Sequence, residues 1–394
     1  MRPGDWPHVY AHLDADAFYV TVELLRHPEL RGKPVVVARS GPRAVVTTAS
    51  YEAREFGVGS AIPAATARRL CPQAVFVEPD FEAYRSVSKR MMDRVRAHVE
   101  TVEVIGLDEA YVDLGGMVAP RAAVRRLVSE IRADTGITCS VGIGPSKLVA
   151  KVASDAEKPA GFVVLTREEA CARFAAAPAR LLPGIGAKTA ERLEAMGIAT
   201  VGALGAAAPE ALAERFGARL GPYLRARGRF EDDSPVSQER IAVSESRETT
   251  FPADIADRAE QAAVLTRLAR ELCTGLARHD RRGRTIAIKV RLADFTTVTR
   301  ARTIPLATND AEQVAAIARA LLEDYAPHGP WRPSPTSPRS RRPTRSSRCP
   351  SRPPGARRAA RRSWAATPRA RPRRGARATA RCRRRGGAGG RSRT

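Results

Sequence analysis

Two acidic segments of the sequence could hold metal ions if the fold brings them together. Asp14 and Asp16 lie in "HLDADAFYVTVE", at the end of an apolar stretch, and Asp108 and Glu109 lie in "VEVIGLDEAYVDL". If the first stretch pairs as a strand with the second, Asp14 lies beside Asp108 and Glu109. Carboxylates this close repel one another unless cations lie between them, and oxygen ligands favour hard ions such as Mg²⁺. Two such ions could stabilise the attacking and leaving oxygens of a phosphoryl transfer.

Apolar patterns around these acids predict the elements that position them. Alternating apolar residues predict a strand, a turn and a second strand across residues 102–114, and the stretch before Asp14 predicts another strand. On these residues alone, the alternative to a metal site is that Asp108 caps the hairpin turn while Glu109 is exposed. The other expected elements before residue 167 are a hairpin that turns at residues 40–43, a strand at 137–144 and helices at 81–99, 121–134 and 145–159. Together they predict an α+β sheet with helices packed on one face.

The rest of the chain changes character twice. Residues 167–232 are rich in alanine, and glycines break their short helical stretches, which predicts a separate helical unit. The next segment is polar and contains a Ser-Pro pair, so we place a linker at residues 233–243. Two strands flanked by helical segments are expected beyond it. In the first of them, Ile286 and Ile288 lie on the face opposite Lys289, which suits either a nucleic-acid platform or a plain solvated face.

Almost all of the net charge belongs to the end of the chain. The formal charge is +25, and residues 330–394 contain 22 Arg but no Lys, Asp or Glu, so 25 − 22 leaves +3 for residues 1–329. This segment also lacks Leu, Ile, Val, Phe, Met and Tyr, so it cannot bury enough apolar surface to fold, and we expect it to be disordered. It is either a polybasic arm for nucleic acid or the product of a shifted reading frame in GC-rich DNA.

Cysteine spacing and the lack of long apolar segments indicate where the protein acts in the cell. The six Cys are scattered without a Cys-x-x-Cys pair and His is sparse, which argues against a zinc site or a disulfide framework. The first ten residues contain no apolar signal region, and no run approaches the ~18 apolar residues of a membrane span. We therefore expect a cytoplasmic protein with no membrane partner.

Six motifs in a fixed order carry a specific resemblance. They run from His12 to Arg300, and the match continues to about Pro327. Together they resemble a Y-family, translesion DNA polymerase of the DinB (DNA polymerase IV) type. Each motif alone is common, whereas the ordered set is specific. The motifs are "HLDADAFYVTVE", "YEAREFGVGSAIP", "GLDEAYVDL", "SVGIGPSKLVAKVASDAEKPAG", "LPGIGAKTAERLEAMGI" and "ADFTTVTR".

The resemblance implies an α+β multidomain fold. It comprises a polymerase palm that carries the acids, small fingers, a helical thumb with a helix-hairpin-helix, and a little finger of βαββαβ order. The expected bounds are 1–17 and 80–166 for the palm, 18–79 for the fingers, 167–232 for the thumb, 244–329 for the little finger and 330–394 for the disordered tail.

The same resemblance implies a reaction and a set of metal ligands. The reaction is attack of a primer 3′-hydroxyl on the α-phosphate of a deoxynucleoside triphosphate, with two Mg²⁺ ions per site. Asp14 and Asp108 would bridge both ions and Glu109 would hold the catalytic one. The backbone carbonyl of Ala15 would complete the nucleotide-side ion, and Asp16 would be structural.

Other motif residues are assigned to substrates by the resemblance. Tyr19 matches the steric gate that excludes ribonucleotides by colliding with a 2′-hydroxyl, while its neighbour Phe18 packs in the core. The glycines of the hairpin let backbone N–H groups approach a DNA phosphate without reading sequence. The triphosphate ligands would be Thr48, Tyr51, Arg54 and Lys158, and the DNA contacts would be Gly184, Gly186 and Lys188.

The sequence departs from the family at three places. Gly106 stands where the family usually has Ser, and Gly59 stands where many members have Arg. After His328 we find neither the apolar strand that completes the little finger nor the motif that binds the sliding clamp, so clamp binding is not expected. Primer–template DNA and deoxynucleoside triphosphates are the expected partners of a monomer.

Two other functions are consistent with parts of the sequence. One is a Y-family homologue that binds DNA but polymerises weakly, and the other is a non-enzymatic, basic nucleic-acid-binding protein. The complete set of Asp14, Asp108 and Glu109 argues against both.

Overall fold

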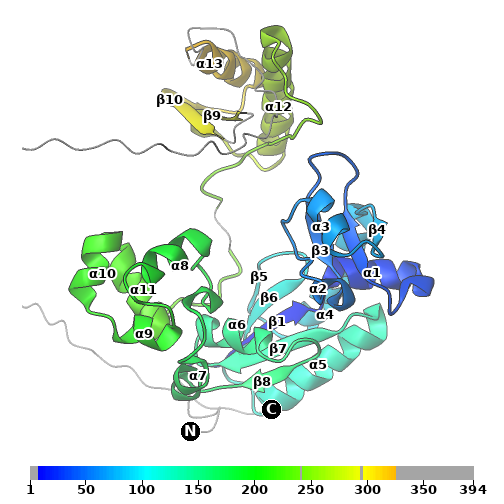
Figure 1. Ribbon diagram of the computed structural model, residues 1–394, viewed down its shortest axis with the longest axis vertical. Coiled ribbons are helices and arrows are strands. Elements are labelled where there is room, and N and C mark those ends of the chain that lie inside the picture. Colours follow the sequence, from blue (N-terminus) through cyan, green and yellow to red (C-terminus); the bar gives the residue numbers. More distant parts are fainter. Residues whose placement is uncertain (1–7, 240–241, 293–295, 325–394) are drawn as a thin grey trace, which may run out of the picture. The chain divides into compact units, whose positions relative to one another are not determined.

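The computed structural model describes residues 8–239, 242–292 and 296–324, and Figure 1 shows their helices and strands. Two predictions concern residues outside these ranges, namely the disordered tail at 330–394 and the missing final strand. Within the described ranges, no helix is long and apolar enough to cross a membrane.

A five-stranded sheet holds both acidic segments. Its strand order is β5-β6-β1-β7-β8, and β1 is antiparallel to both of its neighbours. The strand, turn and strand expected across residues 102–114 are therefore confirmed, as is the pairing with the first strand. The bounds are β1 Tyr10–Ala15, β5 Val102–Val104, β6 Glu109–Asp113, β7 Cys139–Gly144 and β8 Phe162–Val164.

Three helices bury one face of this sheet. They are α1 (Phe18–Arg26), α4 (Phe81–His98) and α5 (Pro120–Thr135). Ala11 and Leu13 of β1 share their core with apolar side chains of the three helices. Because side chains alternate along a strand, His12 and Asp14 lie on the opposite face.

A fourth helix, α6 (Lys147–Asp155), lies on that opposite face, so the prediction of helices on one face is wrong for α6. Ser154 of α6 contacts the ring of His12, with 2.9 Å between Oγ and Nδ1. The helix α6 can approach β7 closely because Gly142 of β7 has no side chain. A Cβ at this position would lie only 2.0 Å from the carbonyl oxygen of Ala150. A side chain at this position would push α6 away from the sheet.

A second sheet has its own small core. Its order is β3-β2-β4, in which β2 and β3 form the predicted hairpin and β4 is parallel to β2. Ser50 caps the short helix that follows β3, because its hydroxyl accepts a hydrogen bond from the N–H of Ala53. The elements are β2 Val35–Ala38, β3 Val46–Ala49, β4 Val75–Val77, η2 Pro28–Leu30, α2 Tyr51–Arg54 and α3 Ala64–Leu70.

The alanine-rich segment folds into the predicted helical unit. Its interior leucines, among them Leu193, Leu204 and Leu224, are fully buried, and Thr166 and Glu169 form a capping box at its start. The elements are α7 Arg167–Phe174, η3 Ala179–Leu181, α8 Ala187–Glu194, α9 Val201–Ala206, α10 Pro209–Phe216 and α11 Leu220–Gly228.

The beginning of the expected linker is held against the five-stranded sheet. Val236 is 8% exposed, and the backbone N–H of Ser237 donates to the side chain of Glu103 in β5 at 2.9 Å. A hollow of about 610 Å³ lies between β5 and residues 237–239. Its lining includes none of Asp14, Asp108 and Glu109, and we assign it no chemistry.

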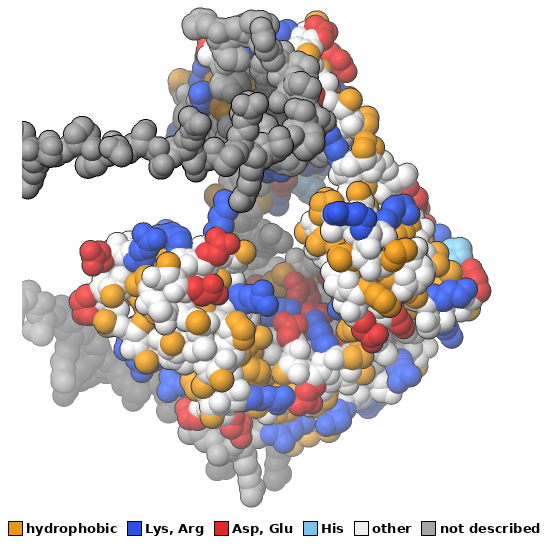
Figure 2. All heavy atoms as spheres, viewed as in Figure 1, with side chains coloured by type: hydrophobic (Ala, Val, Ile, Leu, Met, Phe, Trp, Pro, Cys, Tyr) orange, Lys and Arg blue, Asp and Glu red, His pale blue; other side chains and the backbone are white. Residues whose placement is uncertain are grey.

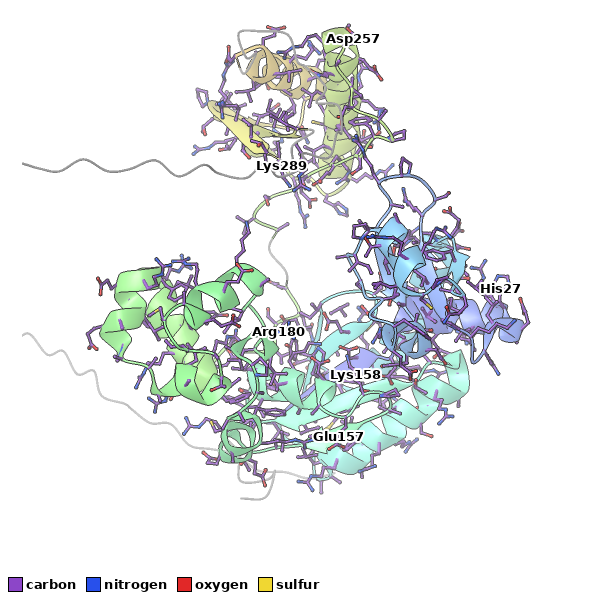
Figure 3. All side chains as sticks on the ribbon, in the orientation of Figure 1. His27, Glu157, Lys158, Arg180, Asp257 and Lys289 are labelled. Atoms are coloured by element: carbon purple, nitrogen blue, oxygen red, sulfur yellow. The ribbon has the colours of Figure 1, made fainter. Side chains whose placement is uncertain are left out.

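The last described domain has the order α12-β9-β10-α13. Ile286 and Ile288 of β9 are buried against α13, and Lys289, labelled in Figure 3, is exposed as predicted. These four elements match the central αββα portion of the expected βαββαβ order. No strand forms over the described residues between 242 and 257, so the first strand of the expected order is not found there. The bounds are α12 Arg258–Arg278, β9 Gly283–Arg291, β10 Thr297–Thr308 and α13 Ala311–Asp324.

Candidate active site

Asp14, Asp108 and Glu109, here called the acid cluster, lie at one end of the five-stranded sheet, and ligand atoms of Asp14, Glu109 and His12 come within 4.8 Å of one another. Asp14 on β1 is directly opposite Glu109 on β6. The turn before β6 is tied to β1 because the N–H of Ala15 donates to the carbonyl of Asp108 at 2.9 Å. Figure 2 shows acidic and basic side chains intermixed over this part of the molecule. The structure therefore places the three residues that the sequence selected at the same end of the sheet, with Asp14 and Glu109 paired and Asp108 in the adjoining turn.

Two lysines neutralise much of the acid cluster. Lys151 on α6 places its Nζ atom 2.8 Å from Asp14 Oδ2 and 3.1 Å from Glu109 Oε2. Lys158, labelled in Figure 3, lies 2.8 Å from the other oxygen of Asp14 and 2.7 Å from Asp155. Lys158 was predicted as a triphosphate ligand, whereas Lys151 was missed.

The cations and the burial act differently on the three carboxyl groups. Burial alone would raise the pKa of Asp14, but Lys151 and Lys158 outweigh it and the pKa is lowered. His12 and Lys151 likewise lower the pKa of Glu109 to about 2. In contrast, burial and the charges of Asp14 and Glu109 raise the pKa of Asp108. Asp108 is thus the carboxylate that most lacks a positive partner.

The donor set fits a hard divalent cation. Within the described ranges, no Lys, Arg or His contacts the Asp108 carboxylate, and the whole cluster faces two ammonium groups with three carboxylates. The Nε2 atom of buried His12 lies 3.2 Å from Glu109 Oε2 and has no other polar partner among the described residues. A small, highly charged cation bound by carboxylate oxygens would relieve this excess of negative charge.

A hollow of about 200 Å³ opens beside the acid cluster. Lys158 and Arg54 bring positive charge to it, and the Arg54 guanidinium lies over the Tyr51 ring at 4.7 Å. Every predicted nucleotide-binding residue lines this hollow. Its lining is Asp14, Ala15, Ala17, Phe18, Tyr19, Thr47, Thr48, Tyr51, Arg54, Ser60, Asp108 and Lys158.

The ring of Tyr19 is held by other aromatic rings. It packs against Tyr84 at 4.6 Å and Phe81 at 5.9 Å between ring centroids. The Tyr84 hydroxyl in turn donates to the buried carboxylate of Glu23 at 2.6 Å. Phe18 is only 2% exposed, in agreement with its predicted place in the core.

The buried carboxylate of Asp16 is held by hydrogen bonds near the hollow. Its carboxylate accepts hydrogen bonds from the Ser140 hydroxyl at 2.7 Å and from the backbone N–H of Ala160 at 2.8 Å. Asp16 is 2% exposed and fixes the loop that carries Lys158. This arrangement agrees with a structural role.

The hairpin residues of the helical unit lie at the start of α8. Gly184 has a φ of +91°, a conformation that favours glycine, and Gly186 directly precedes the helix. Both glycines and Lys188 are exposed. Backbone N–H groups at a helix start are suited to bind a phosphate.

Sequence reasoning missed His12 and Lys151. His12 is two residues before Asp14, so strand alternation alone places it on the same face, and this signal was available. No comparable signal existed for Lys151, because its position depends on the face that α6 covers.

Family comparisons cover most of the chain. The model of the impB/mucB/samB family matches residues 13–155, and that of the impB/mucB/samB family C-terminal domain matches residues 242–335. Between them, the model of a DNA polymerase-iota thumb domain matches residues 180–229.

Curated relatives and solved structures agree with the family models. The DNA polymerase IV of Streptomyces coelicolor is 43% identical over 79% of this chain and 66% of its own length. That of Methanoculleus marisnigri is 39% identical over 80% of this chain and 89% of its own length. A chimeric Y-family DNA polymerase covers 80% of this chain and 93% of its own at 25% identity with a TM-score of 0.71. DinB from Sulfolobus solfataricus has the same coverage and identity with a TM-score of 0.56.

Proposed function

Because the chain belongs to the Y family of DNA polymerases, in its DinB (DNA polymerase IV) branch, we propose that it extends primers by two-metal phosphoryl transfer at the acid cluster. It is a template-directed DNA polymerase of the translesion class. The observation that supports this chemistry is the position of Asp14, Asp108 and Glu109 beside a hollow lined by cationic side chains.

The acid cluster would hold two Mg²⁺ ions, and the carboxylates of Asp14, Asp108 and Glu109 would be their ligands. When bound, Mg²⁺ makes the primer 3′-hydroxyl more acidic and stabilises the charge that develops on the phosphates. The register between β1 and β6 fixes Asp14 relative to Glu109 without help from the metal. The carbonyl of Ala15, which lines the same hollow, is a further candidate ligand.

The incoming deoxynucleoside triphosphate would occupy the hollow. Lys158 and Arg54 carry positive charge, and the hydroxyls of Thr48 and Tyr51 can donate hydrogen bonds to its phosphates. Tyr19 would lie under the sugar and exclude ribonucleotides, because the packing of its ring leaves it little freedom to move.

Primer–template DNA would be held by the other domains. We assign Gly184, Gly186 and Lys188 to a DNA phosphate, and keep the domain bounds expected from the sequence. We further propose a monomer that acts in the cytoplasm and does not use the usual sliding-clamp motif.

Primer extension by the purified full chain tests this function. A labelled primer on a DNA template should be extended with MgCl₂ and deoxynucleoside triphosphates, and EDTA should stop the reaction. A primer left unextended at every Mg²⁺ concentration would contradict the proposal, provided that a control binding assay shows that the chain binds primer–template.

A further inference from the structure

Lys151 makes the contacts that a bound cation would make. Its ammonium group joins the two strands of the acid cluster, because it contacts Asp14 Oδ2 on β1 and Glu109 Oε2 on β6. Its side chain is 21% exposed, against 12% for Asp14 and 26% for Glu109. Asp155, the remaining acidic neighbour, lies farther away at 3.5 Å.

The helix that carries Lys151 has little freedom to withdraw. Ser146 caps α6, since its hydroxyl accepts from the N–H of Val149. Gly142 and Gly144 of β7 let the backbone of α6 lie against the sheet, and the apolar side of the helix is buried. The position of the ammonium group is therefore set by the fold, apart from the rotations of its own side chain.

Lys158 differs from Lys151 in its contacts. It reaches Asp14 Oδ1 but not Glu109, and it also lines the hollow assigned to the triphosphate. Of the two lysines, Lys151 alone contacts both strands of the acid cluster. The imidazole of His12 lies 3.2 Å from Glu109, and no cationic side chain of the described residues contacts the Asp108 carboxylate.

We propose that Lys151 is the resident counter-ion of the acid cluster, which neutralises Asp14 and Glu109 before a divalent cation binds and competes with that cation for the same oxygens. The inference rests on the proposed function, because that function makes the cluster a metal site. An ammonium group and a metal ion that share Asp14 Oδ2 and Glu109 Oε2 cannot both bind at full strength. Lys151 thus stabilises the metal-free protein and weakens the first binding of metal.

Metal titration of the full chain tests this role without DNA or nucleotide. Lys151→Met keeps most of the apolar stem and removes the charge. In EDTA it should unfold at a lower temperature than the wild type, because the two carboxylates lose their shared cation. Added Mg²⁺ should raise its unfolding temperature more than that of the wild type, with a half-saturating concentration on the order of tenfold lower.

Lys147→Met is the matched control on the same helix. Lys147 pairs with Glu103, at 2.6 Å, and not with the acid cluster. Its loss should lower the stability in EDTA but leave the half-saturating Mg²⁺ concentration within twofold of the wild-type value.

Three outcomes would overturn the proposal. They are a Lys151→Met protein with an unchanged Mg²⁺ response, one that needs more Mg²⁺, or a Lys147→Met protein with the same gain in affinity. If Lys151→Met does not fold, Lys151→Arg decides. The Lys151→Arg protein keeps the positive charge, so its half-saturating Mg²⁺ concentration should be at least as high as that of the wild type. A lower value would refute competition between this side chain and Mg²⁺. Wild-type primer extension, measured in parallel, separates a failure of this inference from a failure of the proposed function.

Discussion

Replacement of Gly142 by Ala tests how the fold places α6 over the acid cluster. The new Cβ would lie 2.0 Å from the carbonyl oxygen of Ala150 and 2.3 Å from the backbone nitrogen of Ser154. Real Cβ atoms essentially never come within 3.0 Å of such atoms, so strand and helix must separate by about 1 Å. Both contacts are with helix backbone, which cannot rotate away.

The energetic cost follows from this separation. Overpacking of a well-packed core costs typically about 1–3 kcal/mol, and we expect the upper end here. That corresponds to a fall of roughly 6–12 °C in Tm, at about 2–4 °C per kcal/mol for a domain of this size. Because β7 pairs with the strand that carries Asp14, a shift of about 1 Å in β7 should also displace Asp14 and lower primer extension by roughly 100-fold.

Thermal and denaturant unfolding of Gly142→Ala, followed by primer extension, provide the assay. Gly59→Ala is the matched control for stability, because no atom lies within 4 Å of a Cβ built there. Its free energy of unfolding should stay within about 0.5 kcal/mol of the wild-type value. The reasoning is refuted if Gly142→Ala is as stable as Gly59→Ala, since α6 would then not depend on the close contact.

Three further substitutions test the substrate contacts. Tyr19→Ala should increase ribonucleotide incorporation by at least about tenfold while deoxynucleotide incorporation survives, and unchanged discrimination in single-nucleotide insertion would exclude Tyr19 as the gate. Lys158→Gln should raise the KM for the deoxynucleoside triphosphate by about tenfold, and steady-state kinetics that show an unchanged KM would remove it from the triphosphate site. Lys188→Gln should reduce the log–log salt slope of DNA binding by about one unit, and an equal slope in a fluorescence-anisotropy titration would show that Lys188 makes no phosphate contact.

The acid cluster could be predicted because its geometry follows from local pattern. Alternating apolar residues around Asp108 indicate the β5–β6 hairpin, and antiparallel pairing with β1 then places Asp14 opposite Glu109. The hairpin of β2 and β3 could be predicted equally well, because both strands and the turn between them are contiguous in sequence.

The parts that could not be predicted depend on tertiary contact. The face covered by α6 is decided by the absence of side chains at Gly142 and Gly144, and two glycines in an apolar strand do not reveal their neighbour. Lys151 then reaches carboxylates that lie 42 and 137 residues away in sequence. The hypothesis that metal ions neutralise the acids did not include Lys151 and Lys158, which already neutralise part of their charge.

Asp108→Asn tests the central claim most directly, because it separates the function of the carboxylate from its effect on stability. Asp108 is a poorly neutralised carboxylate whose pKa is raised by burial and by Asp14 and Glu109. Without metal, its replacement by neutral Asn should therefore leave Tm unchanged or raise it, since like-charge repulsion is removed. Primer extension in Mg²⁺ should nevertheless fall by at least about 10³-fold, which is about 4 kcal/mol in barrier. An Asp108→Asn protein that extends primers within tenfold of the wild-type rate would contradict the assignment of the acid cluster as the catalytic metal site.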